Sequence, residues 1–281
     1  MIRRPPRSTL SSSSAASDVY KRQIMLKGKR IIVTGSARGM GEATLNAYVQ
    51  AGADVVGMDV TDDAGGSISE KANKTGTGKC SYIHDDVSDK SSVDDSFSKA
   101  AEILGGLDVL AHPAAIQRAS DASNVSVEDW DLMFSVNVKG TMLTNQIAYK
   151  YMKESGGGSI INFGSISGLR PEPSASAYSA AKGAVHSWTR TASGTWGKDN
   201  IRVNAILPAM ATPMYYAARE RSTEEENIAS HWRNSVPISL GQEYGDPDRD
   251  LAPVMVFFAS DSSRFITGQL IPVDGGQTAG L

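Results

Sequence analysis

Short runs of apolar, often β-branched residues recur along the chain from residue 30 to the C-terminal region. Most of these runs are almost continuously apolar, which is typical of strands buried on both faces of a parallel sheet. They predict seven strands, at Arg30–Thr34, Asp54–Asp59, Cys80–His84, Leu107–Ala111, Ser159–Phe163, Ile201–Leu207 and Gln269–Val273.

Helical patterns lie between these runs. In residues 92–104, apolar side chains recur at three- and four-residue spacing on one face. A longer helix is expected from Asp129 to about Met152, and another from Tyr178 towards Trp196. Because strands that alternate with helices form right-handed βαβ units, we expect an α/β fold. Its core would be a doubly wound parallel sheet of about seven strands with helices on both faces.

The first 24 residues show no helical or strand period. They contain Pro5-Pro6, a serine run at Ser11–Ser14 and five basic residues against one acidic residue. This composition predicts disorder. We expect residues 1–24 to be a disordered leader, either a foreign extension, which we favour, or an organellar targeting segment. No repeat or linker divides the rest, so residues 25–281 are expected to form one domain.

The charge of the chain is uneven. Of its 28 Lys/Arg and 31 Asp/Glu residues, 23 basic and 30 acidic residues follow the leader, so the predicted domain is acidic. An acidic body repels phosphate backbones, and we expect no nucleic-acid binding. No apolar run reaches the roughly 18–20 residues that span a bilayer, so no membrane segment is expected.

Cysteine and histidine are sparse. Cys80 is the only cysteine, which is typical of a protein from a reducing compartment, and we expect a cytoplasmic location. The four histidines are scattered along the chain, without the spacing of metal ligands. We therefore expect no metal.

A glycine-rich turn follows the first predicted strand and leads into a helix near Glu42–Ala51. Glycines let a backbone turn sharply beside a pyrophosphate, and a helix N-terminus offers N–H groups to it. The spacing, G-x-x-x-G-x-G, differs from the commoner G-x-G-x-x-G fingerprint. A plain strand–helix connection is the alternative interpretation. We expect a dinucleotide to be held by Gly35, Ser36, Arg38, Gly39, Met40 and Gly41.

An acidic residue ends the second predicted strand. Asp59 follows Gly41 by 18 residues, where a carboxylate can accept hydrogen bonds from ribose hydroxyls and repel the 2′-phosphate of NADP. This favours NAD over NADP, with Arg38 as the competing signal, since a guanidinium binds a 2′-phosphate. Asp86 and Val87, after the third predicted strand, are expected near the adenine.

The strongest catalytic signal is the pair Tyr178 and Lys182, in Tyr178-Ser179-Ala180-Ala181-Lys182. Residues four apart share one helix face. A free tyrosine titrates near ~10, and a lysine ammonium beside it is expected to stabilise the phenolate and lower that pKa. The pair would then take a proton from an alcohol or give one to a ketone.

Two further polar residues are candidates for the same site. Ser165 follows the fifth predicted strand, where open α/β sheets bind ligands, so we expect it to bond the substrate oxygen. Ser167 is its nearby competitor. Asn137 interrupts the apolar pattern of a predicted helix, and it either lies on a solvated face or holds a water that relays protons through Lys182.

Together these motifs resemble those of the short-chain dehydrogenases/reductases. T-G-x-x-x-G-x-G, the strand-end acid, N-V-K-G, G-S-x-S-G, Y-S-A-A-K and V-N-A-I-x-P occur in that family's order, from Lys27 to about Gly276. The resemblance implies a Rossmann-type fold with strand order 3-2-1-4-5-6-7, and a homotetramer or homodimer. It implies a catalytic tetrad of Asn137, Ser165, Tyr178 and Lys182, with Tyr178 as acid/base. It also implies cofactor contacts from Pro113, Ala114, Tyr178, Lys182, Pro208 and Thr212.

Two segments depart from the family pattern. After the fourth predicted strand, His112-Pro113-Ala114-Ala115 replaces the usual N-N-A-G. His112 is expected either to be a neutral structural replacement or to bring a titratable group to the nicotinamide pocket. After the sixth predicted strand, Pro208–Thr212 replaces a Pro-Gly segment and is one residue shorter, which leaves the position of Thr212 open.

A charge-rich helical segment, about residues 212–246, corresponds to the family's substrate lid. Met214 and Tyr215 either pack this lid onto the body or line an apolar pocket. Gln117 and Ser167 are further candidates for substrate contact.

These features predict an oxidoreductase that transfers a hydride between NAD(H) and a secondary alcohol or ketone. An NADPH-dependent 3-oxoacyl-[acyl-carrier-protein] reductase is the alternative enzyme, which Asp59 disfavours. A nucleotide-sensing protein without turnover is the alternative of another class, disfavoured because Tyr178 and Lys182 are both present.

Overall fold

The computed structural model describes residues 25–279. Within this part of the chain, the strands form one parallel sheet in the order β3-β2-β1-β4-β5-β6-β7, as expected. The leader expected at residues 1–24 lies outside the described residues. The strands are β1 (Arg30–Thr34), β2 (Asp54–Asp59), β3 (Lys79–His84), β4 (Val109–His112), β5 (Gly158–Phe163), β6 (Ile201–Pro208) and β7 (Leu270–Val273).

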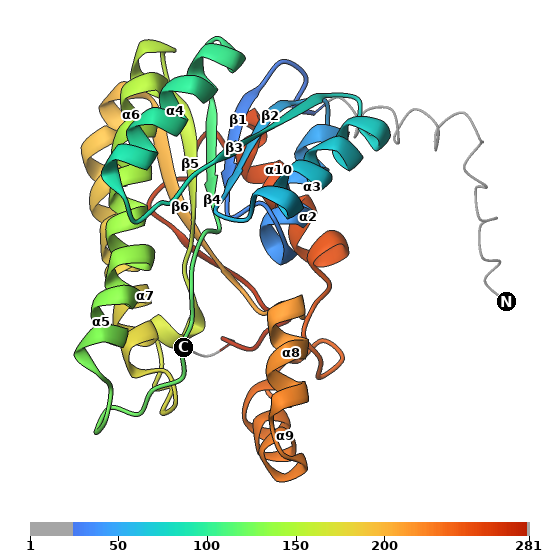
Figure 1. Ribbon diagram of the computed structural model, residues 1–281, viewed down its shortest axis with the longest axis vertical. Coiled ribbons are helices and arrows are strands. Elements are labelled where there is room, and N and C mark those ends of the chain that lie inside the picture. Colours follow the sequence, from blue (N-terminus) through green and yellow to red (C-terminus); the bar gives the residue numbers. More distant parts are fainter. Residues whose placement is uncertain (1–24, 280–281) are drawn as a thin grey trace, which may run out of the picture.

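Helices cover both faces of the sheet, which confirms the predicted doubly wound α/β fold (Figure 1). One face carries α2 (Gly39–Gln50), α3 (Asp62–Thr75) and α10 (Ala252–Ala259). The other face carries α4 (Lys90–Leu104), α6 (Gly140–Glu154) and α7 (Ser176–Trp196), and α5 (Val127–Phe134) leads into α6. None of the described helices is both long and apolar enough to cross a bilayer.

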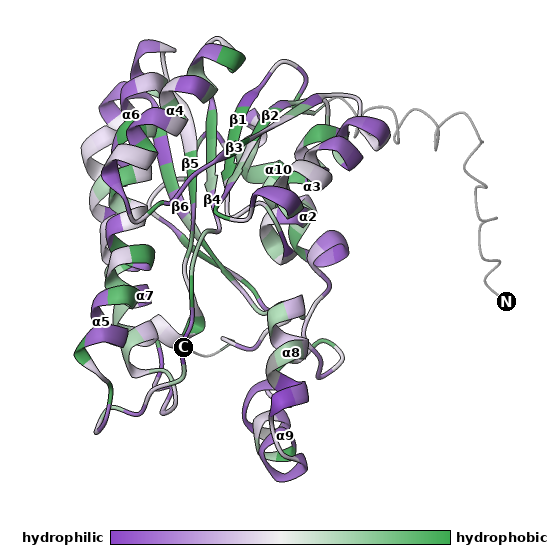
Figure 2. Ribbon diagram, in the orientation of Figure 1, coloured by the Kyte–Doolittle hydropathy of each residue, from purple (hydrophilic) through white to green (hydrophobic). Residues whose placement is uncertain are grey.

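Successive residues of the buried strands contribute to two separate cores. In β1, Ile31 and Val33 belong to a core with α2 and α10, whereas Ile32 belongs to a core with α4 and α6. Figure 2 shows apolar strands between helices whose outer faces are polar. Burial on both faces explains why these strands are apolar at nearly every position.

Beyond the carboxyl ends of the strands, two short helices extend away from the body (Figure 1). They are α8 (Pro213–Arg221) and α9 (Glu224–Ser230), and they fall in the segment expected to be a lid. Thr223 and Glu226 form a capping box at the start of α9, which explains locally why the chain begins a new helix there.

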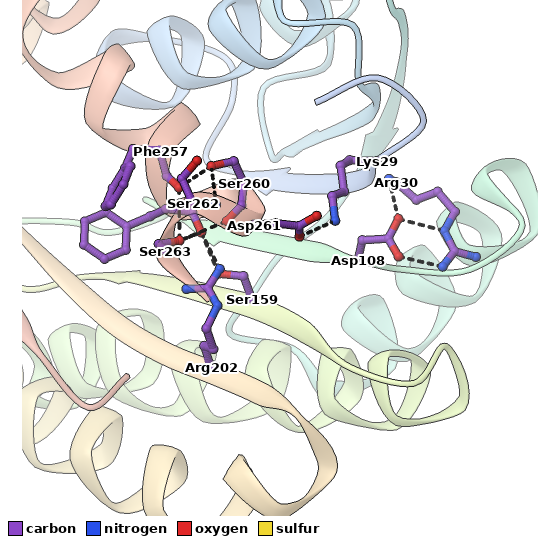
Figure 3. A network of polar contacts seen from close by, with 11 residues as sticks. Lys29, Arg30, Asp108, Ser159, Arg202, Phe257, Ser260, Asp261, Ser262 and Ser263 are labelled. Carbon is purple, nitrogen blue, oxygen red and sulfur yellow. Dashed lines mark hydrogen bonds and ion pairs between the residues drawn. The ribbon is translucent and has the colours of Figure 1, made fainter. Parts of the chain in front are cut away.

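Polar contacts stabilise the amino-terminal ends of the strands, at the end of the sheet opposite α8 and α9 (Figure 3). The Asp108 carboxylate accepts hydrogen bonds from Arg30, through the backbone N–H at 2.8 Å, Nε at 2.9 Å and Nη2 at 2.6 Å. The Phe258 carbonyl oxygen accepts from Arg202 Nη2 at 2.8 Å and from the Ser159 hydroxyl at 2.9 Å. These contacts join β1, β5 and β6 to the segment before β4 and to α10.

The Arg30–Asp108 ion pair is half-buried, so the ionisation of Asp108 affects the stability of the folded state. Burial raises the pKa of Asp108, but the hydrogen bonds and positive charge of Arg30 outweigh burial and hold that pKa below its usual value. The folded state therefore favours the ionised carboxylate.

We predict that Asp108→Ala lowers the free energy of unfolding by about 2 kcal/mol at neutral pH, since it leaves the Arg30 guanidinium without its carboxylate. Because the folded-state pKa lies below the unfolded one, this contribution is present above the unfolded pKa and is lost as pH falls through the folded pKa. Urea unfolding at neutral and acid pH measures both effects.

Lys29→Ala is the matched control, because it removes an ion pair with Asp261, whose side chain is 86% exposed. Exposed pairs contribute little, so we expect a change within about 0.5 kcal/mol. If Asp108→Ala lowers the free energy of unfolding no more than Lys29→Ala does, the half-buried pair does not stabilise this end of the sheet.

Candidate active site

The sheet reverses its order between β1 and β4, and open α/β sheets bind ligands at such a switch point. The loops that follow these two strands approach closely. A Cβ atom on Gly35 would lie 2.7 Å from the Ala114 Cα atom, and Gly35 has a φ of +60°. Position 35 therefore needs glycine for space and for conformation.

The glycine spacing also has a physical cause in the start of α2. A Cβ atom on Gly41 would lie 1.9 Å from the Gly35 carbonyl oxygen. Any larger residue at position 41 would push the first turn of α2 away from the loop. The N-terminal N–H groups of α2 thus lie directly beside the turn, an arrangement that fits a pyrophosphate.

A pocket opens at this edge, from the glycine loop past the ends of β2 and β3 to β4 and α8. It brings together most of the predicted cofactor residues, namely Gly35, Arg38, Gly39, Met40, Gly41, Asp59, Asp86, Val87, Pro113, Ala114 and Thr212. Lining residues that the sequence prediction did not include are Val60, Thr61, Asp85, Ala115, Ile116, Val136 and Pro213. Each of these lies within two residues of a residue predicted for the site, and Val136 directly precedes Asn137.

Four predicted cofactor residues are not among those that line this pocket. Ser36 is buried under the loop, where its hydroxyl donates to the Met58 carbonyl oxygen at 3.3 Å. Pro208 is the last residue of β6, and Tyr178 and Lys182 lie on α7. Ser36 thus holds the loop to β2, and its assignment to cofactor contact stays a prediction.

Asp59 connects the pocket to the shape of the glycine loop. Its Oδ2 accepts a hydrogen bond from the Ala37 N–H at 3.0 Å, and its Oδ1 accepts one from the Thr61 N–H at 3.0 Å. An ionised carboxylate offers about four acceptor sites, so ribose hydroxyls can bond to it as well. The Arg38 side chain, the competing signal for a 2′-phosphate, is exposed at the pocket wall.

A second carboxylate, Asp85 after β3, lines the pocket and is almost completely buried. Burial raises the pKa of Asp85 to about 6, against the opposing effect of hydrogen bonds from Ser96 and Ser92. The Ser96 hydroxyl donates to Asp85 Oδ1 at 2.9 Å and the Ser92 hydroxyl at 3.3 Å. The neighbouring Asp86 binds its own turn, accepting from the Ser88 N–H at 2.9 Å.

The helix α7 brings the predicted catalytic pair to the end of β5. Lys182 is buried, and its Nζ donates to the Phe163 carbonyl oxygen at 2.7 Å. The same Nζ lies 5.5 Å from the centre of the Tyr178 ring. Ser165, just after β5, hydrogen-bonds the Tyr178 side chain. Three of the four predicted catalytic side chains therefore meet at one strand end.

Burial dominates the ionisation of this pair. It raises the pKa of Tyr178 to about 12, although the Ser165 hydrogen bond lowers it, and it lowers the pKa of Lys182 to about 8. The expectation that Lys182 lowers the pKa of Tyr178 is not met, because the ammonium is directed to the Phe163 carbonyl. The phenol is therefore a neutral acid at neutral pH.

Asn137 lies in a π-helical turn, η1 (Ser135–Lys139), that interrupts the predicted long helix between α5 and α6. Its side chain accepts from the Ile116 N–H at 2.9 Å and donates to the Ile116 carbonyl at 2.9 Å. It is 1% exposed, so the interpretation as a residue of a solvated face is wrong. Asn137 holds the loop after β4, which forms one wall of the pocket.

His112 is buried at the end of β4. Its Nδ1 lies 2.8 Å from the Thr34 hydroxyl and 3.3 Å from the Thr144 hydroxyl. Burial, and then the charge of Lys182, lower the pKa of His112 to about 3. The side chain is thus neutral over the physiological range, which supports the interpretation as a structural replacement over that as a titratable group.

The shortened segment after β6 still brings Thr212 to the pocket. The Ala209 N–H bonds the Val273 carbonyl at 3.0 Å, and the Ala211 N–H bonds the Gly245 carbonyl at 2.8 Å. These contacts hold the segment between β7 and Gly245, near the end of the predicted lid. The Thr212 hydroxyl caps α8 by accepting from the Tyr215 N–H at 3.3 Å.

The four predicted substrate residues are separated in this structure. Met214 lines the pocket, whereas the Tyr215 ring packs on Tyr244 within the predicted lid, with ring centres 4.8 Å apart. Ser167 accepts a hydrogen bond from the Ser165 hydroxyl at 3.2 Å. Gln117 is exposed on the loop after β4. Their roles towards a substrate stay predictions.

The sequence and fold match one family over nearly the whole domain. A family profile described as enoyl-(acyl carrier protein) reductase matches residues 35–278. The 3-oxoacyl-[acyl-carrier-protein] reductase FabG of Thermotoga maritima is 34% identical over 256 residues, which cover 89% of this chain and 98% of that protein. The chain belongs to the short-chain dehydrogenase/reductase family.

Other similar proteins are also dehydrogenases or reductases. Meso-2,3-butanediol dehydrogenase from Serratia marcescens is 32% identical, with 89% of this chain and 95% of that protein covered. A short-chain type dehydrogenase/reductase structure from Mycobacterium marinum is 29% identical, with a TM-score of 0.82 over 93% of this chain and 99% of that one. Levodione Reductase is 26% identical, with a TM-score of 0.85 over 91% and 100%. Short-chain dehydrogenases/reductases are oxidoreductases that use nicotinamide cofactors.

Because burial disfavours the charged lysine, we predict that Lys182→Met raises the free energy of unfolding by about 2 kcal/mol at pH 7, after allowance for the lost bond to Phe163. The folded-state pKa of Lys182 lies below the unfolded value. In the wild type, the free-energy cost of burying the charged Lys182 is therefore complete below about pH 8, and it disappears as the pH rises towards 10.5. The stability gain of Lys182→Met should shrink over that interval.

Urea unfolding across this pH range tests the prediction, with the exposed Lys150→Met on α6 as control. The control should change little at any pH. A difference between Lys182→Met and wild type that does not depend on pH would contradict the assignment of the penalty to the buried charge.

Proposed function

We propose that this protein transfers a hydride between NAD(H) and a secondary alcohol or ketone, as an NAD-dependent dehydrogenase or ketoreductase with Tyr178 as acid/base. The observation that carries the proposal is the meeting of Tyr178, Lys182 and Ser165 at the end of β5. This cluster stands at the carboxyl edge of the sheet that also bears the glycine-loop pocket.

The pocket residues fit a dinucleotide. Gly35 and Gly41 line the pocket beside the start of α2, where a pyrophosphate would bind, and Asp59 offers acceptors to the ribose of the adenosine. Asp86 and Val87 would lie near the adenine, and Thr212 near the nicotinamide. When bound, the nicotinamide would supply or accept the hydride.

In the reduction direction, the neutral Tyr178 phenol gives its proton to the substrate oxygen, and in oxidation the phenolate takes that proton from the alcohol. The Ser165 hydroxyl hydrogen-bonds the same oxygen and orients it. Lys182, whose Nζ lies 5.5 Å from the centre of the Tyr178 ring, would bind the ribose of the nicotinamide. Asn137 keeps the loop after β4 in place through Ile116.

The relatives support the substrate class. Their names include a 3-oxoacyl-[acyl-carrier-protein] reductase, a meso-2,3-butanediol dehydrogenase and a trans-4-hydroxycyclohexanecarboxylate dehydrogenase. Each name places the reaction at a carbon that bears an oxo or hydroxyl group. The expected homotetramer or homodimer and the cytoplasmic location remain predictions.

Turnover by the full chain with NAD and with NADP is the first test, on a panel of meso-2,3-butanediol, trans-4-hydroxycyclohexanecarboxylate and a 3-oxoacyl thioester. We predict that Tyr178→Phe lowers kcat at least about 1000-fold, since it removes the acid/base, while the dissociation constant of NAD stays close to that of wild type. Absorbance of the reduced nicotinamide and calorimetric titration measure the two quantities.

Three outcomes would overturn parts of the proposal. Faster turnover with NADPH on the 3-oxoacyl thioester would favour the reductase of that class. Cofactor binding without turnover on any substrate would favour a nucleotide sensor. Undiminished turnover in Tyr178→Phe would show that another group moves the proton.

We further predict that Asp59→Ser weakens NAD binding about 10-fold and reduces discrimination against NADP, because it removes the acceptors for the ribose hydroxyls and a charge that repels the 2′-phosphate. Asp62→Ser is the matched control, three residues further along, where the carboxylate is bonded by His84 and Tyr82. Titration of both variants with NAD and NADP measures the change. Equal selectivity in Asp59→Ser and wild type would contradict the role of Asp59.

A further inference from the structure

The face of α7 that carries Tyr178 and Lys182 continues one turn further to His186, four residues on. His186 is 2% exposed and lies against the loop Gly164–Gly168, which carries Ser165. His186 lies outside both the Y-S-A-A-K and the G-S-x-S-G motif. Its contacts nevertheless converge on the serine of the proposed site.

The imidazole supplies the hydrogen-bond acceptor that the end of β5 lacks. The Gly164 N–H donates a hydrogen bond to the Ile206 carbonyl oxygen at 2.8 Å, which is the last backbone contact between the end of β5 and β6. The next backbone donor, the Ser165 N–H, bonds His186 Nε2 at 3.2 Å. A backbone N–H in this half-buried turn needs a partner, and α7 provides it through one side chain.

The loop is shaped around the ring. A Cβ atom on Gly164 would lie 2.5 Å from His186 Nε2, and a Cβ atom on Gly168 would lie 2.7 Å from His186 Cε1. Both glycines of the G-S-x-S-G motif therefore make room for the imidazole. Neither has a φ in the left-handed region, so space and not backbone conformation explains glycine at these two positions.

The imidazole is neutral and its accepting nitrogen faces Ser165. Burial, then the charges of Lys182 and Arg190, lower the pKa of His186 to about 4. Since Nε2 accepts a bond, the proton is on Nδ1, which has no hydrogen-bond partner among the described residues. An aliphatic side chain would fill this space without burying an unpaired N–H. What the histidine adds is the acceptor for Ser165.

We propose that His186 is a positioning residue of the reaction, which fixes the Ser165 backbone and so directs the Ser165 hydroxyl to the oxygen that Tyr178 protonates. The Ser165 hydroxyl also accepts from the Ser167 N–H at 3.1 Å. The bond to His186 fixes the backbone of Ser165, and the two bonds between its hydroxyl and Ser167 fix the side chain. The inference rests on the proposed oxidoreductase function.

The test compares His186→Leu with His186→Gln. Leucine fills the space but has no acceptor, whereas glutamine places an amide oxygen at about the position of Nε2. Thr189→Val, one turn further along α7, is the matched control. It removes a different buried bond between α7 and β5, from Asn162 Nδ2 to the Thr189 hydroxyl at 3.1 Å.

We expect His186→Leu to lower kcat about 10-fold, with the KM for NAD little changed, because a misdirected hydroxyl affects the chemical step more than cofactor binding. His186→Gln should recover most of the rate, and Thr189→Val should lose stability but keep kcat. If His186→Leu does not fold, His186→Met takes its place. Wild-type kcat in His186→Leu, or equal kcat in the Leu and Gln variants, would overturn the proposal.

Hydrogen–deuterium exchange of the peptide that contains Ser165 separates this inference from the proposed function, because it needs no substrate. Faster exchange of that peptide is expected in His186→Leu and not in His186→Gln or Thr189→Val. If exchange behaves in this way but wild type turns over nothing, the proposed function fails and the contact stands. Unchanged exchange in His186→Leu would refute the contact itself.

Discussion

The register of α7 against the carboxyl end of β5 is the constraint on which the site depends. One side chain of α7, Lys182, bonds the last carbonyl of the strand at Phe163, and the next one along its face, His186, bonds the backbone two residues later at Ser165. These two contacts set the position of α7 along and around its axis relative to the end of β5. Tyr178, one turn earlier, is thereby held beside the Ser165 hydroxyl.

At the carboxyl ends of the strands, where this site lies, some buried charged and polar groups lack partners within the described part of the chain and lower stability. At the amino-terminal ends of the strands, the polar contacts are paired and stabilise the fold. At the carboxyl edge, a lysine is buried without a carboxylate, and Asp85 and His112 each have a buried atom with no partner among the described residues. At the amino-terminal edge, Arg30 and Asp108 are paired with full hydrogen bonding (Figure 3). Function and stability are thus separated along the strands, as expected where an active site requires groups that folding alone would not favour.

The sequence predicted the strands well, and it predicted residues that the structure brings together at one end of the sheet, because both follow from local pattern. Strands buried on both faces are apolar at each position, and the glycine loop needs small residues wherever backbones meet, as at Gly35 and Gly41. Other properties depend on three-dimensional surroundings. The π turn at Asn137, the raised pKa of Tyr178 and the contact between His186 and Ser165 each join segments far apart in the chain or arise from burial. No spacing rule encodes such properties.

Asp59 shows how closely recognition and architecture are joined at the pocket. Its carboxylate accepts from Ala37 inside the glycine loop and from Thr61 after β2, so it fixes the loop that would hold the pyrophosphate. The same oxygens would face the ribose. A substitution that removes the charge to admit a 2′-phosphate therefore also frees two backbone N–H groups and loosens the loop. Under the proposed function, cofactor preference at this site would therefore be coupled to the order of the glycine loop.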